Sequence, residues 1–440
     1  MRRTSCWSKS YLSVHSALLA ATSVLATLTP GASALAEELV PTVCSPRLSP
    51  VDSSRPTTVV GSGYRESCTE QALQSAISRG GVVTFHCGGP ATIAITRTLE
   101  VPTDRDTTID GGDLVTLDGL GSTQLLRAVR EDFQTNDRVL TVQRIALVNG
   151  RDAGRGFQAR QGDRPCAWGY KEGGGGAITA RDMNVHAWGV RFENNRGPEL
   201  GPDVAGGAIF MMGAKRLVVE NSIFRGNAAS NGGAVGMLQT SAELSNVLLV
   251  DNHATGTGAN FGGASGCPTF NHDEQGGAGG VGGAFSSDGF DAGDRFCGVH
   301  MADNTSNDLG GAVFRSAYWG IVSNVSRQAI TWEQSRFERN RSAKGGGGAA
   351  YVNNSLFTLR SVSFSDNDSG PGDGGALKIT GLTVRADDLQ FSGNRASWGG
   401  GVAHWQGGPE GSGSASNVRF TGNVSTSGSE ANDAVGDFPR

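Results

Sequence analysis

The chain has 440 residues, of which 67 are Gly and only 14 are Pro, and its formal net charge is -5. Gly makes up about 15% of the chain, roughly twice its usual share, but the scarcity of Pro excludes a collagen-like helix. With 37% apolar and 18% charged residues the chain is not of the disordered type, and it has no sequence-wide basic footprint for nucleic acid. This composition fits a repeat protein with many tight turns.

The N-terminus has the pattern of a secretory signal. Arg2 and Arg3 give a basic start, and an apolar stretch at 17–28 leads to small residues at 32–36 that suit a signal peptidase. The alternative is a membrane anchor, but the apolar run is shorter than the roughly 20 residues that span a bilayer. We therefore expect residues 1–36 to be removed, leaving a mature chain without a transmembrane segment, secreted or on the outer cell surface.

The cysteines that follow the signal are even in number, which in an exported chain predicts disulfides. No Cys-x-x-Cys or zinc-type spacing is present. Connectivity does not follow from sequence alone. The preferred pairs are Cys68 with Cys87 and Cys267 with Cys297, and the remaining pair would be Cys44 with Cys166.

Residues 37–67 are predicted to be an extended polar lead-in, and residues 68–81 a short helical segment. Within that segment the apolar positions of Thr69–Ser78 form one helical stripe, made of Ala72, Leu73, Ala76 and Ile77. Thr69 is a suitable N-cap, and Gly80-Gly81 ends the helix. Short alternating segments then predict strands at 82–85, 92–95, 107–109, 115–117 and 139–142, with turn signals such as Asp110-Gly111-Gly112 between them.

Two short motifs alternate along the rest of the chain. The first is Gly-Gly-Ala followed by an apolar residue, and it begins at Gly175, Gly206, Gly232, Gly282, Gly310 and Gly374, with a variant at Gly399. The second is Phe-x-x-Asn, with Phe/Asn at 192/195, 224/227, 337/340, 364/367, 391/394 and 420/423, and looser copies at Leu249/Asn252 and Met301/Asn304.

The spacing of these motifs predicts stacked coils. Phe337, Phe364 and Phe391 follow one another at intervals of 27 residues, and a fixed period of 20 to 50 residues is typical of solenoids. The strands between the turns are too short to bury a face alone, so each is expected to pair in parallel with its equivalent in the next coil. Ala and Phe then point inward, Gly-Gly bends the chain, and Asn bonds its own copies along the stack.

The motifs closely resemble the polymorphic outer membrane protein repeat of bacterial surface proteins, within the right-handed parallel β-helix (pectin-lyase-like) group. The motifs cover 174–425, and the fold resemblance extends over 68–440. It implies an all-β, right-handed parallel β-helix over residues 82–440, with residues 68–81 as an N-terminal capping helix. The C-terminal membrane barrel common in those relatives has no counterpart after Asn423 in this sequence, so autotransport is not expected.

Function in such folds is expected on loops that interrupt the regular coil. Three interruptions are predicted, at 151–173, 255–280 and 286–299, and each contains cysteine. The best candidate site joins Phe270, His272 and Asp273 with Arg295, on the expectation that the second and third interruptions lie close together.

Individual residues within the interruptions also have ordinary interpretations. The run His272-Asp273-Glu274 invites an acid/base reading, but a solvated loop is favoured. Asp288, Asp291 and Asp294 offer oxygen ligands for calcium, but they match no known calcium loop, and solvation is favoured. No cofactor or metal is therefore assigned, and Ca²⁺ has no support beyond that triplet.

Three tryptophans lie in or beside irregular segments and are candidates for stacking on sugar rings: Trp168, Trp319 and Trp405. The function expected is a monomeric binding or adhesin-like module for carbohydrate or another cell-surface component. The alternative is an extracellular polysaccharide lyase or glycoside hydrolase. A cleft lined by two convergent carboxylates would favour the enzyme.

Overall fold

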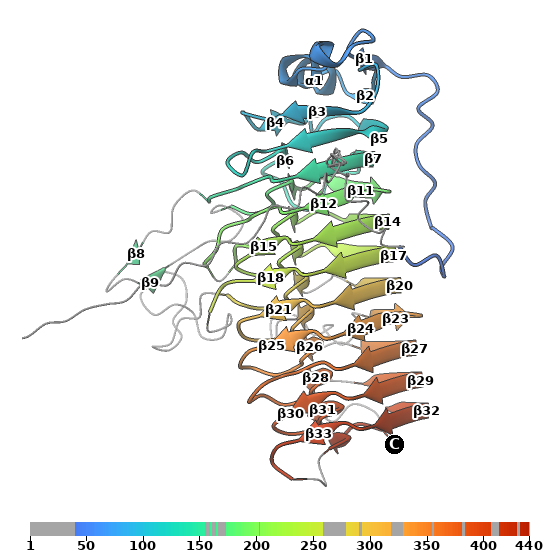
Figure 1. Ribbon diagram of the computed structural model, residues 1–440, viewed down its shortest axis with the longest axis vertical. Helices are drawn as coiled ribbons and strands as arrows, with labels where there is room; N and C mark the ends of the chain where they lie inside the picture. Colours follow the sequence, from blue (N-terminus) through green and yellow to red (C-terminus); the bar gives the residue numbers. More distant parts are fainter. Residues whose placement is uncertain are drawn as a thin grey trace, which may run out of the picture. The chain divides into compact units, whose positions relative to one another are not determined.

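The repeats fold into coils that stack along one axis as a right-handed parallel β-helix, as the sequence predicts (Figure 1). The computed structural model describes residues 40–154, 159–160, 164–165, 173–201, 203–257, 279–289, 293–317, 329–353, 356–380, 383–405, 413–428 and 432–439. Of residues 159–160, 164–165, 404 and 405 it describes the backbone alone. From Val40 onward the chain forms a single compact unit.

Sheet A is a 15-stranded sheet on one side of the coil. Its strands are β1 Thr58–Val60, β2 Gly81–Phe85, β3 Ala91–Ala94, β5 Thr107–Asp118, β7 Val139–Val148, β11 Asn184–Trp188, β12 Arg191–Glu193, β14 Arg216–Arg225, β17 Ser241–Val250, β20 Asp294–Ala302, β23 Ala329–Glu333, β24 Arg336–Glu338, β27 Leu356–Ser365, β29 Val384–Ser392 and β32 Ser414–Thr421.

Sheet B is an 11-stranded sheet across the interior from sheet A. Its strands are β4 Leu99–Glu100, β6 Leu126–Val129, β10 Ile178–Arg181, β13 Ile209–Met212, β16 Val235–Leu238, β19 Phe285–Asp288, β22 Val313–Ser316, β26 Ala350–Asn353, β28 Leu377–Thr380, β31 Val402–Trp405 and β34 Ala434–Gly436.

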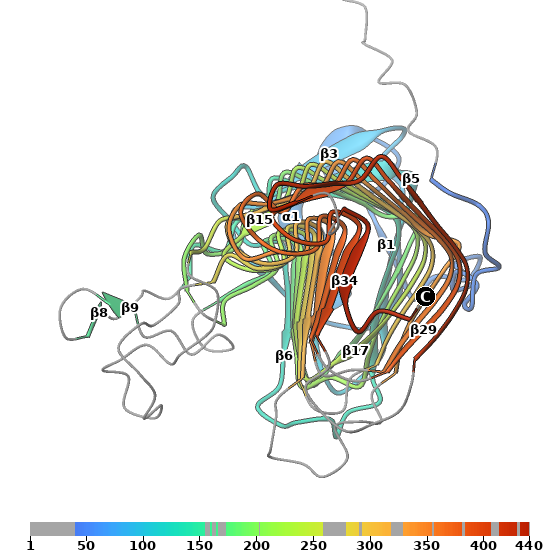
Figure 2. The ribbon, with the colours of Figure 1, turned by 90° about the horizontal axis from the view of Figure 1, so that it is seen from below.

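Sheet C consists of two-residue strands between sheets A and B: β15 Ala228–Ala229, β18 His253–Ala254, β21 Thr305–Ser306, β25 Arg341–Ser342, β30 Arg395–Ala396 and β33 Val424–Ser425. Figure 2, which looks along the stack, shows the strands of successive coils superimposed in rows. The pairing in sheets A, B and C is parallel. The antiparallel pair is β8 Ala159–Arg160 with β9 Arg164–Pro165, outside those sheets.

The Gly-Gly-Ala motif places the chain at the start of each sheet B strand. Gly206 has φ +72, a left-handed conformation that favours glycine. A Cβ atom on the next residue, Gly207, would lie 2.2 Å from the carbonyl oxygen of Gly233 in the following coil. The third residue, Ala208, is fully buried in the interior. The motif therefore combines a sharp bend, a close approach between coils and a small inward side chain.

The Phe-x-x-Asn motif forms two continuous columns. Asn340 is representative: its backbone N–H and its Nδ2 both donate to Oδ1 of Asn367 in the next coil, at 2.9 and 3.0 Å. The same Nδ2 also donates to the carbonyl of Met301 in the preceding coil, at 2.9 Å. The column of buried amides consists of Asn195, Asn227, Asn252, Asn304, Asn340, Asn367, Asn394 and Asn423.

The phenylalanines stack as the 27-residue spacing predicts. Phe337, Phe364 and Phe391 are fully buried, and neighbouring rings lie 5.0 Å apart between centroids with nearly parallel planes. Phe420 continues the stack at the same distance but is only partly buried. The looser repeat copies keep the register, since Leu249 pairs with Met301 and Met301 with Phe337.

A short helix covers the N-terminal end of the stack. Helix α1, Glu70–Ile77, begins where expected, with the Thr69 side chain accepting a hydrogen bond from the Ala72 N–H. A 3-10 turn, η1 Arg65–Ser67, precedes it. The buried face of α1 joins the interior core through Leu73, Ala76 and Ile77. No helix in the described part of the chain is long and apolar enough to cross a membrane.

Several sequence predictions need correction. The segments 107–109 and 115–117 are one strand, β5, which bends at Asp113 (φ +61). The third interruption, 286–299, is mostly regular coil, because its residues belong to β19 and β20.

The disulfide predictions are confirmed in part. Cys68 is bonded to Cys87 as expected. Cys44 is bonded to Cys297, so the pairs Cys267–Cys297 and Cys44–Cys166 are wrong. The reason is that residues 40–57 run along the stack outside sheet A and bring Cys44 to β20 (Figure 1). Cys166 and Cys267 lie outside the described residues.

The Phe column allows a matched stability test. Replacing the central ring, Phe364→Ala, should lower the free energy of unfolding by roughly 3–5 kcal/mol, as for other fully buried aromatic side chains. Phe420→Ala removes the same atoms from the partly buried end of the column and should cost less. Urea unfolding followed by circular dichroism measures both, and equal losses would contradict a column that is packed most tightly at its centre.

Candidate functional site

The turns that vary in length all border sheet B. The turn from sheet A to sheet C keeps one length: β14 ends at Arg225 and β15 begins at Ala228, and β29 ends at Ser392 and β30 begins at Arg395. The turn from sheet C to sheet B ranges from a few residues to the whole interval between Ala254 and Phe285. The turn from sheet B to sheet A also varies. Loops therefore flank the outer face of sheet B on both edges, which makes it the face where a binding site is expected.

A groove lies on this outer face over the first coils. Its floor comes from β4, β6, β10 and β13, whose side chains alternate between the interior and the outside. The outward positions line up across the coils, with Glu100 beside Arg127, Arg127 beside Thr179, and Thr179 beside Phe210. A second outward row contains Val129, Arg181 and Met212. Parallel pairing thus converts single residues from distant parts of the chain into a continuous surface.

The groove is large and mostly polar. Its volume is about 740 Å³, within the range of ligand sites in proteins. Apart from Phe210, Met212, Val129 and Ala180, the described lining consists of charged and polar residues and Gly173. The charged residues are Arg97, Glu100, Arg127, Glu131, Arg151, Asp152 and Arg181, and hydroxyl groups come from Thr96, Thr98, Ser122, Thr123 and Thr179. Such a lining suits a ligand with many hydroxyl groups better than an apolar one.

Gln124 and Asp152 fix one wall of the groove. The Gln124 Nε2 atom donates to the Gly175 carbonyl at 2.9 Å, to Thr179 Oγ1 at 2.8 Å and to Asp152 Oδ2 at 3.2 Å. Asp152 Oδ2 also accepts from the Gly174 N–H at 2.9 Å. These bonds tie the turn that enters β6 to the turn that enters β10, so the wall is held before any ligand arrives.

The arginines of the groove form a ladder with carboxylates. Arg127 Nη1 lies 3.3 Å from Glu100 Oε2, Arg181 contacts Glu131, and Arg151 Nη2 lies 3.6 Å from Glu199 Oε1. The backbone N–H of Arg97 donates to Glu70 Oε1 at 2.8 Å. Since a guanidinium has five N–H donors, the single carboxylate beside Arg127 leaves donors of that side chain for ligand oxygens.

Two carboxylates lie further along the same face. Asp288 is the last residue of β19, in register with Leu238 of β16, which is itself in register with Met212 at the edge of the groove. Asp203 belongs to the turn before β13 that crosses the outer face of sheet B, where Ala205 approaches Gly236 closely. At about 4.8 Å per coil, Asp288 lies two coils, on the order of 10 Å, beyond Met212.

The two carboxylates influence each other. Asp288 is 8% exposed and Asp203 is half-buried. Burial, reinforced by the negative charge of Asp288, raises the pKa of Asp203 to about 7. A carboxyl with a pKa near neutral pH keeps a substantial protonated fraction there and can donate a proton.

Most of the site residues proposed from sequence lie outside the described part of the chain. Trp168, Phe270, His272, Asp273 and Trp319 lie outside the described residues, and for Trp405, the last residue of β31, only the backbone is described. Arg295 lies on β20 in sheet A, with its Nη2 atom 2.9 Å from Glu333 Oε2. The ends of the second interruption instead meet the coil beside Ser230, whose carbonyl accepts from the Gly256 and Gly280 N–H groups. Whether Arg295 shares a site with Phe270, His272 and Asp273 stays a prediction, because those three residues lie outside the described residues.

The expectation that Asp288 and Asp294 are solvated is wrong, because both are buried. Asp294 lies in the interior, where its Oδ2 is 3.2 Å from Arg315 Nε and both side chains are almost fully covered. Burial raises the pKa of Asp294 to about 6, although the Arg315 charge opposes this. Asp291 is outside the described residues, and no group of three or more metal-ligating side chains occurs among those described.

Sequence reasoning missed the groove because it looked for function in the interruptions. The sequence does carry a sign of the groove in the outward positions of the sheet B strands. Thr179 and Arg181 stand at the same distance after their Gly-Gly-Ala as Phe210 and Met212 do after the next copy. The outward positions are therefore polar in β10 and apolar in β13.

No family model and no curated sequence matches the chain. Solved structures resemble it in fold, with low identity. The surface adhesin PfbA of Streptococcus pneumoniae is 11% identical at a TM-score of 0.41, over 82% of this chain and 89% of that chain. The catalytic domain of GH87 α-1,3-glucanase, in complex with nigerose, is 12% identical at a TM-score of 0.40, over 89% of this chain and 69% of that chain.

The A-module of the mannuronan C-5 epimerase AlgE4 of Azotobacter vinelandii is 12% identical at a TM-score of 0.30, over 83% of this chain and 96% of that chain. These likenesses assign no role to any residue of the groove or to the two carboxylates.

The raised pKa of Asp203 predicts a pH-dependent stability difference. Its folded pKa of about 7 exceeds the reference value of 3.8, so the associated stability is present below pH 3.8 and is lost as the pH rises through 7. Asp203→Asn should therefore raise the melting temperature at pH 8 relative to the parent, and much less at pH 4. Asp113→Asn, at an exposed position, is the matched control. A stabilisation that is the same at both pH values would contradict the shift.

Proposed function

We propose that this chain is an exported β-helix protein that binds a polysaccharide along the outer face of sheet B. The observation that carries the proposal is the groove of about 740 Å³ with its ladder of arginines, carboxylates and hydroxyl groups. Each coil repeats the outward positions about 4.8 Å further along the stack. A linear, hydroxyl-rich polymer lying parallel to the axis therefore meets hydrogen-bonding groups from several coils at once.

Export is part of the same proposal. Residues 1–36 would act as a cleavable signal, and the two disulfides suit an oxidising compartment. We assign the repeats to the Gly-Gly-Ala-Ile and Phe-x-x-Asn type of the polymorphic outer membrane proteins, with residues 37–67 as a lead-in, 68–81 as the cap and 82–440 as the coil. The protein would act at the outer cell surface or after release.

The groove proposal is tested by the same substitution, Arg→Gln, at one position on sheet B and one on sheet A. A glycan array on the parent protein first identifies a ligand. Arg127→Gln, in the groove, should then weaken its binding about tenfold or more, because the loss of a charge-assisted hydrogen bond costs roughly 1.5–3 kcal/mol. Arg385→Gln makes the same change at an exposed position of β29 in sheet A and should leave affinity unchanged.

Calorimetric titration at one salt concentration, with melting temperatures for each variant, separates lost binding from lost folding. The groove is excluded as the site if Arg127→Gln binds like the parent, or if Arg385→Gln is the variant that loses affinity. A parent protein that binds no polysaccharide on the array would contradict the proposed function itself.

A second candidate function is glycan cleavage, and the Asp203–Asp288 pair is the observation that favours it. In glycoside hydrolysis one protonated carboxyl donates to the leaving oxygen while an ionised carboxylate activates water or attacks the sugar. Burial and the charge of Asp288 keep Asp203 suited to the first role near neutral pH. The groove would then deliver the polymer to the pair.

If the chain cleaves glycans, a screen on neutral glucans and polyuronides should detect new reducing ends. Asp203→Asn and Asp288→Asn should each lower that rate by about 100-fold or more, the usual range for loss of an acid or base. The parent rate should fall as the pH rises through about 7, as Asp203 loses its proton. Asp113→Asn serves as the control. Activity that both active-site variants retain, or no activity on any substrate, would sink the enzyme reading and leave binding alone.

A further inference from the structure

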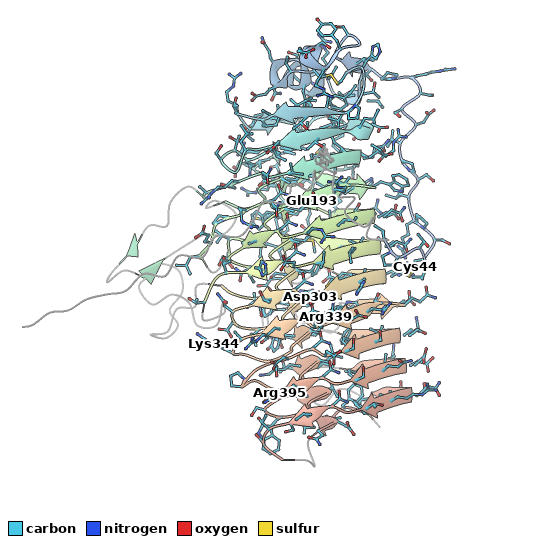
Figure 3. The ribbon with its side chains drawn as sticks, viewed as in Figure 1. Cys44, Glu193, Asp303, Arg339, Lys344 and Arg395 are labelled. Atoms are coloured by element: carbon cyan, nitrogen blue, oxygen red, sulfur yellow. A yellow bond between two sulfur atoms is a disulfide. The ribbon has the colours of Figure 1, made fainter. Side chains whose placement is uncertain are left out.

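A second surface with the features of a binding site lies on the opposite side of the coil, along sheet A. Residues 40–57, termed the strap, run along this outer face against the direction in which the coils advance, and appear in blue beside β7 to β20 in Figure 1. Figure 3 places Cys44 at the far end of the strap. From there to Thr57, whose N–H donates to the Val82 carbonyl at 2.7 Å, the strap passes the strands between β20 and β2.

Two amide side chains of the coil hold the strap by its backbone. Gln143 of β7 accepts from the Val51 N–H at 2.8 Å and donates from Nε2 to the Val51 carbonyl at 2.9 Å. Asn246 of β17 bonds Cys44 in the same way, accepting from its N–H at 2.9 Å and donating to its carbonyl at 2.7 Å. Each amide therefore bonds both backbone groups of one residue, as a neighbouring strand does when a peptide is added to a sheet.

A carboxylate between these two amides completes the row. Glu220 of β14 is 2% exposed and accepts from the Leu48 N–H at 3.1 Å and from the Arg47 N–H. Arg47 also forms an ion pair with Glu243, at 2.6 Å between Nη1 and Oε2. Gln143, Glu220 and Asn246 are all almost fully buried beneath the strap. Three buried polar side chains from three different coils thus face the backbone of one extended segment.

The side chains of the strap that bond the coil are polar: Arg47 pairs with Glu243, and Ser53 accepts from Arg144. Val43 and Val51 are 59% and 38% exposed, so neither valine is buried against the coil. Pro41, Pro46 and Pro50 keep it extended, because proline fixes φ and favours polyproline II geometry. A segment that served only as packing would bury its apolar side chains, as α1 does with Leu73 and Ile77.

We propose that the outer face of sheet A between β7 and β20 is a site for an extended peptide, recognised through its backbone by Gln143, Glu220 and Asn246. The chain's own residues 43–53 occupy this site, and the Cys44–Cys297 disulfide makes the occupation permanent. Gly298 supports the same arrangement, since a Cβ atom there would lie 2.7 Å from Val43 Cγ2 and block the strap. The site is separate from the groove on sheet B and does not depend on a polysaccharide ligand.

The test frees the strap without touching the other disulfide. A site-specific protease sequence is inserted between the exposed Arg55 and Pro56 in the variant Cys44→Ser/Cys297→Ser, which keeps Cys68–Cys87. After cleavage the N-terminal fragment is removed by gel filtration. A fluorescently labelled peptide of residues 40–54, with Ser at position 44, is then titrated onto the remaining coil and followed by anisotropy.

Saturable binding of this peptide is the expected result, and backbone recognition is checked by N-methylation. A peptide N-methylated at Val51 lacks the N–H that Gln143 accepts and should bind about tenfold more weakly or worse. A peptide N-methylated at Ser49, whose N–H donates to no described residue of the coil, should bind like the parent peptide. Gln143→Leu in the coil should weaken the parent peptide to a similar extent as the Val51 N-methyl group.

Three results would overturn the proposal. In the first, the cleaved coil would lose its structure once the strap is gone, as judged by circular dichroism and its melting temperature, and the strap would then be a structural part of the fold. In the second, the folded coil would fail to bind the peptide. In the third, the two N-methylated peptides would bind equally, which would mean that side chains and not the backbone are recognised. Glycan binding by the same cleaved coil is measured in parallel, so that failure of the groove and failure of this site are told apart.

Discussion

The column of buried asparagines is the constraint on which the rest of this structure depends. From Asn227 to Asn394 each Oδ1 accepts two hydrogen bonds from the preceding coil, and each Nδ2 bonds both neighbours. No rung can therefore shift without leaving buried polar groups unpaired. The turn that contains the asparagine therefore keeps one length from β14 to β33. Variation in length is confined to the turns on either side of sheet B. The turn between sheets A and C cannot change in length. The variable loops are therefore found beside sheet B, where the groove also lies.

The interior also contains a buried ion pair, between Arg315 and Asp294. Arg315 occupies an inward position between Ser287 and Val352 in neighbouring coils, where other coils place Met211 and Met237. The short Ser287 side chain leaves room for the arginine stem, and Asp294 supplies the opposing charge at 3.2 Å. Burying such a pair costs solvation that its attraction only partly recovers, and loss of either partner would leave a lone buried charge. The pair lies in the coils next to the sheet B carboxylates, so charge is buried on both sides of β19.

The sequence predicted the structural features that repeat from coil to coil, but it did not predict the contacts that occur once. The 27-residue period predicted the stacked phenylalanines and the asparagine column, because a repeated position in a solenoid must meet its own copies. The helix at 70–77 was predictable from its stripe and its cap. Cys44 was paired wrongly, since the strap runs across the coils and its contacts have no periodic signature. The groove was missed because Glu100, Arg127 and Thr179 become neighbours only once the phase of each strand is known.

The outer faces of sheets A and B carry different polar groups, and only sheet A is partly covered by another segment of the chain. Sheet B carries guanidinium, carboxylate and hydroxyl groups in an open groove, where a ligand has to come from solution. Sheet A carries amide and carboxylate groups that are already saturated by a peptide backbone. A parallel stack presents identical columns on each face, so the difference does not come from the fold. It comes from the residues at outward positions and from a single extended segment held by a disulfide, which covers sheet A between β7 and β20 and leaves the outer face of sheet B uncovered.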